Sequence, residues 1–174
     1  MDCLFETERL KVRKFVMEDA QTLYENHLEE NVKRWLPNES YADIEETQSA
    51  INFYIGCVNN RRLPYVLAVE LKETCELIGD TGVNEVEGKH GEVEIGYCVC
   101  SKYSGRGLAT ELLKAMTEFV VSSFGTDILY GRVMRGNQAS VRVLEKNGYV
   151  FVKEEMGAED DPYGNGMLVY KKEC

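Results

Sequence analysis

Residues 104–111 read Ser-Gly-Arg-Gly-Leu-Ala-Thr-Glu, and this stretch decides the predicted fold. It follows an alternating run at 92–99 that is typical of a strand, and it precedes apolar residues at helical spacing up to residue 120. Glycines let a backbone approach a phosphate, and the first turn of a helix has free N–H groups. We therefore predict an anion-binding loop, with contacts from Ser104, Gly105, Arg106, Gly107, Leu108, Ala109 and Thr110.

The loop does not match the commonest phosphate-binding fingerprints. It lacks the Gly-Lys-Ser/Thr of a P-loop, and Thr110 stands where a Rossmann loop has its third glycine. A Gly-x-Gly pair alone is also compatible with an ordinary turn. The choice between these interpretations depends on the rest of the chain.

A second segment favours phosphate binding. Residues 137–149 read Asn-Gln-Ala-Ser-Val-Arg-Val-Leu-Glu-Lys-Asn-Gly-Tyr and follow a strand-like run at 128–133. Together the two segments resemble the GNAT superfamily, the acetyl-CoA-dependent N-acetyltransferases. The family loop reads Gln/Arg-x-x-Gly-x-Gly/Ala, and Ser104 departs from its first position. The opening at 7–15 resembles the RimJ/RimL-type branch, the ribosomal-protein-alanine acetyltransferases.

The resemblance implies one domain over residues 1–174, of the α/β class in its α+β form. Its sheet would be mixed and mostly antiparallel, with six to seven strands flanked by about four helices. It would be splayed between the strands near residues 97 and 130, where the pantetheine arm of acetyl-CoA would lie. The patterns predict strands at 10–15, 65–69, 76–83, 92–99, 128–133, 149–153 and 167–170. Helices are expected after Asp19, at 44–59, at 108–125 and at 137–148, with a turn at 89–91 and a loop at 159–162.

Composition narrows the partners. A net charge of −10 disfavours nucleic acid and anionic membranes and suits a cationic substrate. The six cysteines form no Cys-x-x-Cys pair and the two histidines are isolated, so we expect no metal site. There is no apolar signal segment and no run of about 18 apolar residues, so we expect a cytoplasmic protein. Both a monomer and a homodimer remain open.

Acetyl transfer to an amine needs a polarised thioester and a neutral amine. The resemblance implies backbone N–H groups near Val99 and Cys100 as donors to the thioester oxygen, although an ordinary sheet ladder could use them instead. Glu92 and Glu94 share one face of a strand, where they could receive a cationic amine. Some family members use an acid at the Glu94 position as the base. A structural or solvated carboxylate is the alternative.

The leaving thiolate also needs a partner. Many family members place a tyrosine where this chain has Leu144, so that proton donor is missing. Ser140 is the best remaining donor, unless its hydroxyl only bonds the start of its helix. Asn137 could pair the pantetheine amides or cap the same helix. Cys98 could accept an acyl group, but no histidine lies nearby in sequence to activate it.

The region before residue 60 resembles the substrate wall of the family. Trp35, Tyr41 and Tyr54 are its candidate contacts, with core packing as the alternative. Arg135 and Arg142 could reach the nucleotide phosphate, or they could be solvated. The leading interpretation is an acetyl-CoA-dependent N-acetyltransferase acting on a primary amine. The rivals are a non-catalytic acyl-CoA-binding module and a nucleotide-phosphate enzyme.

Overall fold

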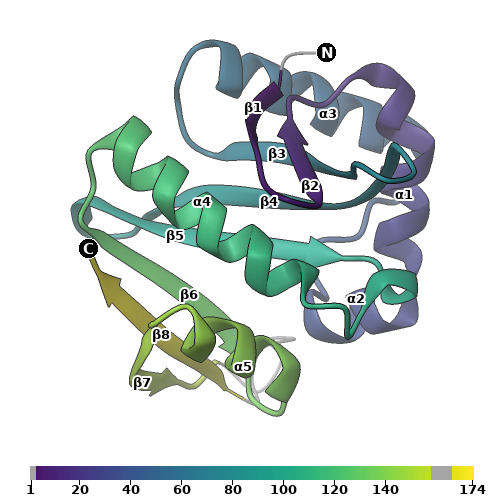
Figure 1. Cartoon of the computed structure of the whole chain (residues 1–174). Helices are drawn as coiled ribbons and strands as arrows, with labels where there is room; N and C mark the ends of the chain where they lie inside the picture. Colours follow the sequence, from purple (N-terminus) through teal and green to yellow (C-terminus); the bar gives the residue numbers. More distant parts are fainter. Residues whose placement is uncertain (1–2, 158–165) are drawn as a thin grey trace.

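The computed structural model describes residues 3–157 and 166–174. Its eight strands form one sheet in the order β1-β2-β3-β4-β5-β6-β8-β7 (Figure 1). The strands are β1 Cys3–Glu6, β2 Leu10–Arg13, β3 Tyr65–Leu71, β4 Glu76–Val86, β5 Lys89–Val99, β6 Ile128–Met134, β7 Val150–Glu155 and β8 Met167–Glu173. The helices are α1 Ala20–Leu28, α2 Glu30–Trp35, α3 Ile44–Asn59, α4 Leu108–Phe124 and α5 Gln138–Lys146, with 3-10 turns η1 Met17–Asp19 and η2 Ser101–Tyr103.

Neighbouring strands are antiparallel except at one place. There β5 runs parallel to β6, and the two strands pair only at Val93 with Leu129 and at Glu94 with Tyr130. Beyond these pairs β5 and β6 diverge, as Figure 1 shows. The rest of β5 stays paired with β4, up to Gly79 with Val99. The expected splay of the sheet is therefore present, and it leaves one edge of β5 open.

Two apolar clusters cover the two faces of the sheet. On one face α4 buries Leu108, Leu112, Leu113, Met116 and Val120, all at most 1% exposed, against side chains of the central strands. The other face carries α1 and α3, whose Leu23 and Ile51 pack on Ala68 of β3. Alternation along β3 separates the clusters, because Leu67 and Val69 belong to the first and Ala68 to the second. Among the described residues, the helices are too short or too polar to cross a bilayer.

The predicted fold class is confirmed, with two additions. β1 and α2 were not predicted, because a segment of four or six residues carries too little periodicity to stand out. Other boundaries agree closely: Asp43 accepts a hydrogen bond from the Glu46 N–H at the start of α3, and Gly125 ends α4 in the left-handed region. The predicted loop at 159–162 lies outside the described residues.

One predicted turn is wrong. Residues 89–91 belong to β5, and the chain reverses just before them, at Glu87 and Gly88. Gly91 has a positive φ because the β4–β5 register shifts there, so that Val86 pairs with Lys89 and Glu85 with Val93. Gly91 therefore lies in a β-bulge within the strand, and a bulge, like a turn, favours glycine.

Candidate active site

A cavity of about 1140 Å³ opens where β5 and β6 diverge. Its floor is the open edge of β5 from Ile95 to Val99, and one end is the glycine loop. The start of α5 forms a second side, and α2 with the segment after it forms a third. The cavity is slightly larger than typical small-ligand sites, which suits an elongated ligand. Most of the residues proposed from the sequence lie along it.

The glycine loop presents free backbone N–H groups. Gly105 and Gly107 have φ values of 73° and 76°, which a residue with a side chain adopts only under strain. The first hydrogen bond within α4 runs from the Glu111 N–H to the Gly107 carbonyl, at 3.1 Å. The N–H groups of the residues between them have no partner within the helix, and no side chain caps it. Ser104, Gly105, Gly107, Leu108, Ala109 and Thr110 all line the cavity.

Arg106 differs from the rest of the loop because its side chain lies outside the cavity lining. Its guanidinium is 3.9 Å from the Glu73 carboxylate and 5.7 Å from the centre of the Tyr103 ring. The positive charge expected beside the phosphate is therefore directed elsewhere. Backbone N–H groups, rather than this side chain, make up the cradle.

Val99 and Cys100 differ in the side of β5 to which their backbone N–H groups point. The Cys100 N–H donates to the Ile78 carbonyl at 2.8 Å, and Cys100 does not line the cavity. The structure thus corrects the assignment of Cys100, whose N–H belongs to the sheet ladder. In an antiparallel pair the direction of the backbone groups alternates, so the N–H groups of Val99 and Tyr97 point away from β4. They face the side from which β6 has departed.

Glu94 lies on β5 at the last pairing with β6 and lines the cavity. Its carboxylate accepts no hydrogen bond from another residue in the described part of the chain, whereas its backbone is paired in the sheet. Burial raises the pKa of Glu94, with Glu155 and Glu39 adding to the effect and Arg132 opposing it. Arg132 is itself paired with Glu155 at 2.5 Å. Glu94 is therefore a partly desolvated carboxylate with free oxygens in the cavity.

Glu92 lies on the same face of β5 but outside the cavity. It accepts a hydrogen bond of 2.7 Å from the Tyr130 hydroxyl and lies 3.3 Å from the Lys89 ammonium. Lys89 also contacts the Tyr130 hydroxyl. These partners hold Glu92 at the closed end of the β5–β6 pair. The predicted role of Glu92 in receiving the substrate is therefore corrected to a structural contact.

The start of α5 places Asn137 and Ser140 side by side on the cavity. The Asn137 side-chain oxygen accepts a hydrogen bond from the Ser140 N–H at 3.2 Å and so caps the helix. The Ser140 side chain lies beside the phenol of Tyr97, with which it shares a side-chain hydrogen bond. Leu144, at the family's tyrosine position, is 1% exposed and packs over Gly131. Ser140 therefore presents a hydroxyl to this side of the cavity, next to the Tyr97 phenol.

The wall opposite α5 agrees only in part with the sequence prediction. Trp35, the last residue of α2, lines the cavity, with its ring next to Gly136. Tyr41 and Tyr54 do not: their hydroxyls are hydrogen-bonded to each other at 3.2 Å, and both rings pack on the α1–α3 cluster. They are corrected to core contacts.

Sequence reasoning missed several cavity residues. Among them are Glu39 of the wall and Tyr97, whose hydroxyl reaches the Ser140 carbonyl at 3.4 Å. Glu39 follows α2, and without a prediction of α2 the sequence did not indicate that this segment forms a wall of the cavity. Tyr97 was visible as an apolar residue of the strand, but only the splay shows that its side chain borders an open cavity rather than a filled core.

His27, Asp80 and Cys98 form a largely buried group at the wall of the cavity, which Cys98 lines. The two nitrogens of His27 lie 2.6 Å from the Glu39 carbonyl and 2.7 Å from the Asp80 carboxylate. Both partners are acceptors, so both nitrogens carry protons and the ring is an imidazolium. Burial opposes that charge, but Asp80 and the Glu39 carbonyl outweigh it, so the pKa of His27 is raised.

Three potential metal-ligand atoms of this group lie within 4.8 Å of one another. The His27 nitrogen and the Asp80 oxygen, however, already satisfy each other through a direct hydrogen bond. Burial raises the pKa of the Cys98 thiol well above its usual value, so the nucleophilic thiolate is disfavoured. The group fits an ion pair beside a neutral thiol, and the expectation of no metal stays a prediction.

Comparisons with known proteins identify the family. Residues 9–150 match the family described as the Acetyltransferase (GNAT) domain. The chain belongs to the GNAT acetyltransferase family. This GNAT chain is 28% identical over 146 residues to "Uncharacterized N-acetyltransferase YoaA" of Bacillus subtilis (strain 168), which covers 84% of the chain and 82% of that relative. It is 27% identical over 169 residues to "Uncharacterized N-acetyltransferase p20" of Bacillus licheniformis, covering 97% and 92%.

Solved structures show the same fold. A GNAT-family acetyltransferase from Bacillus anthracis superposes with a TM-score of 0.81 at 23% identity, covering 99% of this chain and 98% of that one. RimL, a ribosomal L7/L12 α-N-protein acetyltransferase in complex with coenzyme A, has a TM-score of 0.83 at 18% identity and covers 99% and 98%. A spermidine N-acetyltransferase SpeG chimera from Vibrio cholerae and hSSAT has a TM-score of 0.79 at 16% identity, covering 94% and 95%. The GNAT chain is thus an N-acetyltransferase by family, and its acceptor amine is a separate question.

Proposed function

We propose that this GNAT chain transfers the acetyl group of acetyl-CoA to a primary amine by direct attack in a ternary complex. One observation carries the proposal: a single cavity joins the N–H groups of the glycine loop, the open edge of β5 and the free carboxylate of Glu94. An anion site, a slot for an extended chain and a candidate base are the three parts that the reaction requires.

The donor half of the cavity suits a diphosphate on a long arm. The N–H groups at the start of α4 would receive the diphosphate oxygens, helped by the positive end of the helix dipole. The pantetheine amides would pair with the open backbone edge of β5 and with Asn137. The Val99 N–H would then lie near the thioester carbonyl. Structural relatives with CoA bound support this arrangement, because RimL was solved with coenzyme A.

The acceptor half of the cavity would contain the reacting groups. A neutral amine attacks the thioester carbon, a nitrogen–carbon bond forms, and the carbon–sulfur bond breaks as its electron pair leaves on sulfur. Glu94 would take the amine proton, directly or through water, since its raised pKa makes it a better base than an ordinary carboxylate. The Ser140 hydroxyl would hydrogen-bond the departing thiolate.

The acceptor is proposed to be cationic before it reacts. Glu39, Glu94 and Glu155 border the cavity, and the chain as a whole carries a net charge of −10. The structural relatives include enzymes for ribosomal protein termini and for spermidine, which are both amines. We favour the RimJ/RimL-type branch on the opening motif at 7–15. The cytoplasmic location, and the choice between a monomer and a homodimer, stay expectations from the sequence.

A thiol-release assay tests the proposal. Acetyl-CoA is incubated with the protein and a panel of amines: spermidine, single amino acids and peptides with free N-termini. We expect release of free CoA thiol that depends on one class of amine, with the acetylated amine identified by mass spectrometry. Binding of acetyl-CoA without turnover of any amine would favour the alternative, a non-catalytic acyl-CoA-binding module. Failure to bind acetyl-CoA at all would reject both.

A further inference from the structure

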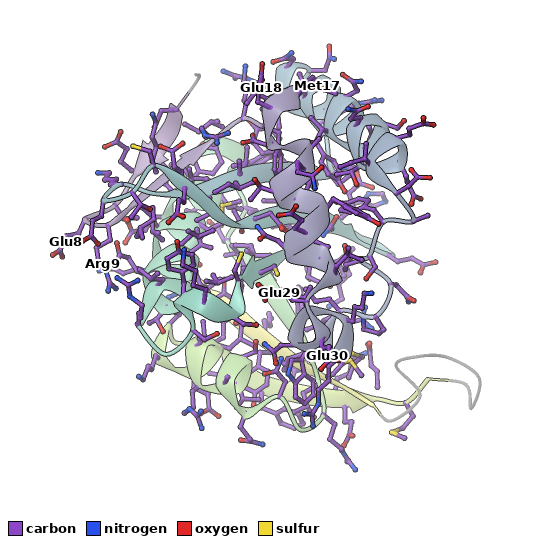
Figure 2. All side chains as sticks on the ribbon, turned by 90° about the vertical axis from the view of Figure 1, so that its right-hand side faces the viewer. Glu8, Arg9, Met17, Glu18, Glu29 and Glu30 are labelled. Carbon is purple, nitrogen blue, oxygen red and sulfur yellow. The ribbon has the colours of Figure 1, made fainter. Side chains whose placement is uncertain are left out.

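The turn between the first two strands is fastened to the glycine loop. Arg9, at the end of that turn, donates from Nη1 to the backbone carbonyl of Arg106 at 2.8 Å. Its Nε and its backbone N–H donate to the two carboxylate oxygens of Glu111, at 2.7 and 2.9 Å. The Thr7 hydroxyl donates to Glu111 at 2.5 Å. Figure 2 labels Arg9 on the side of the molecule that carries the N-terminal strands.

The bond to the Arg106 carbonyl fixes the orientation of one loop peptide. The described chain has a single cis peptide, at Leu63–Pro64, so the peptide between Arg106 and Gly107 is trans. In a trans peptide the carbonyl and the next N–H point in opposite directions. The Arg106 carbonyl is turned outward to Arg9, neither residue lining the cavity, whereas Gly107 does line it. The Gly107 N–H is therefore turned toward the phosphate side.

Without Arg9 this peptide would be free to turn over. Glycines flank Arg106 on both sides, and both have φ values near 75°, so the backbone here meets little steric resistance. A flipped peptide would point a carbonyl oxygen, which is a partial negative charge, at the site of the diphosphate. Arg9 opposes that flip, because the outward carbonyl is its hydrogen-bond acceptor.

Arg9 also pairs with an acidic side chain close to the glycine loop, that of Glu111. Glu111 lies in the first turn of α4, where its charge would repel a bound phosphate. Three donors from Thr7 and Arg9 hold this carboxylate on the outer side of the helix, and they lower its pKa although its partial burial opposes them. The Arg9 side chain is 41% exposed, so the ion pair adds little to stability; its effect lies in orientation.

We propose that Arg9 is a positioning residue for donor binding. It holds the 106–107 peptide in its phosphate-receiving orientation and keeps the charged Glu111 carboxylate paired on the outer side of the helix. The inference rests on the proposed function, since it concerns the diphosphate of acetyl-CoA. Its specific consequence is that the loss of Arg9 weakens the recognition of the nucleotide diphosphate and leaves the rest of the reaction intact.

The test compares two acetyl donors in the thiol-release assay. Acetyl-CoA carries the diphosphate, and S-acetylpantetheine does not. Arg9→Ala should raise KM for acetyl-CoA roughly 10-fold or more, as expected for a charge-assisted contact, with kcat changed little. With S-acetylpantetheine, kcat/KM should stay within about two-fold of the unaltered protein. Arg9→Lys keeps the charge but lacks the planar fork, so it should recover only part of the loss.

Lys72→Ala is the matched control. Lys72 pairs with Glu6 and with the Thr7 carbonyl on the same hairpin, both at 2.7 Å, without a hydrogen bond to the glycine loop. It should leave KM for acetyl-CoA unchanged. The inference is overturned if folded Arg9→Ala and Arg9→Lys both keep the original KM, or if both donors lose activity equally. If the unaltered protein binds no acetyl-CoA, the proposed function fails and this inference fails with it.

Discussion

The hydroxyl of Tyr97, on β5, donates a 3.4 Å hydrogen bond to the carbonyl oxygen of Ser140, on α5. This contact spans the cleft between the two sides of the splayed sheet, and the Ser140 side chain lies beside the same phenol. Burial raises the pKa of Tyr97 to about 12, so its phenol stays protonated and acts as a donor at neutral pH. The two side chains therefore border the place where a thiolate would leave.

Ser140→Ala tests the role of that hydroxyl. If Ser140 hydrogen-bonds the departing sulfur, kcat should fall by about 10-fold or more while KM for acetyl-CoA changes little, because the interaction forms in the transition state. Steady-state kinetics with saturating amine measure both. The helix should survive, since its cap is the Asn137 side chain. A change in KM alone would make Ser140 a donor-binding contact, and unchanged kinetics would remove it from the mechanism.

Gly107→Val tests the phosphate loop. The φ of 76° strains any side chain, and a Cβ there would lie 3.6 Å from the Arg9 guanidinium. Calorimetry should show affinity for CoA reduced by at least about 10-fold, since strain of this kind costs about 1–3 kcal/mol and a branched side chain also hinders close approach. Gly88→Val is the control, because Gly88 has a φ of 73° in the open β4–β5 turn. Equal affinity in both folded variants would contradict the loop assignment.

Glu94→Gln tests the base. The amide keeps the shape but cannot take a proton, so the rate at neutral pH should fall and partly recover as pH rises toward the pKa of the amine. In the unaltered enzyme the rate should drop at low pH as Glu94 protonates, and because its pKa is raised this drop should begin above the range of an ordinary glutamate. Glu92→Gln, two residues along the strand, should keep the original profile. A Glu94→Gln profile parallel to the original would show that the proton leaves by another route.

His27→Gln tests the buried imidazolium through stability. The folded pKa of His27 is raised above its unfolded value of about 6.5, so the charge stabilises the fold fully below that pH. The contribution should decline as pH rises through the folded pKa. Denaturant unfolding between about pH 6 and pH 9 should therefore show the greatest difference from the unaltered protein at the low end. His90→Gln, at an exposed position, should show no such trend. A difference independent of pH would contradict the charged state.

Local signals account for what the sequence predicted well. Asp43, Gly107 and Asn137 act within a few residues of themselves, as helix caps or as a positive-φ turn, so one segment contains the whole argument. The residue types alone indicated the loop, the helix behind it and the cap of α5. The splay between β5 and β6 came from the family resemblance, because no single segment encodes it.

The remaining assignments depend on relationships between distant segments. Whether Val99 or Cys100 offers its N–H to the cavity is set by the register of β5 against β4, which alternation within one strand does not reveal. The ring of Tyr41 turns to Tyr54 because α1 and α3 pack there. The bond from Arg9 to Arg106 joins residues 97 positions apart, and neither segment alone predicts it.

The short pairing between β5 and β6 would make the stability of the protein depend on a ligand bound between them. β4 and β5 share eight ladder positions and β6 and β8 share seven, whereas β5 and β6 share two. A ligand in the cleft would contact both β5 and the β6 side of the sheet. It would stabilise the place where the fewest backbone hydrogen bonds join neighbouring strands. At a concentration 100 times its Kd, a ligand that binds only the folded state adds about 2.7 kcal/mol to the free energy of unfolding. A cell rich in the donor would then keep more of this chain folded and out of reach of its proteases, so that abundance would follow metabolic state without any change in synthesis.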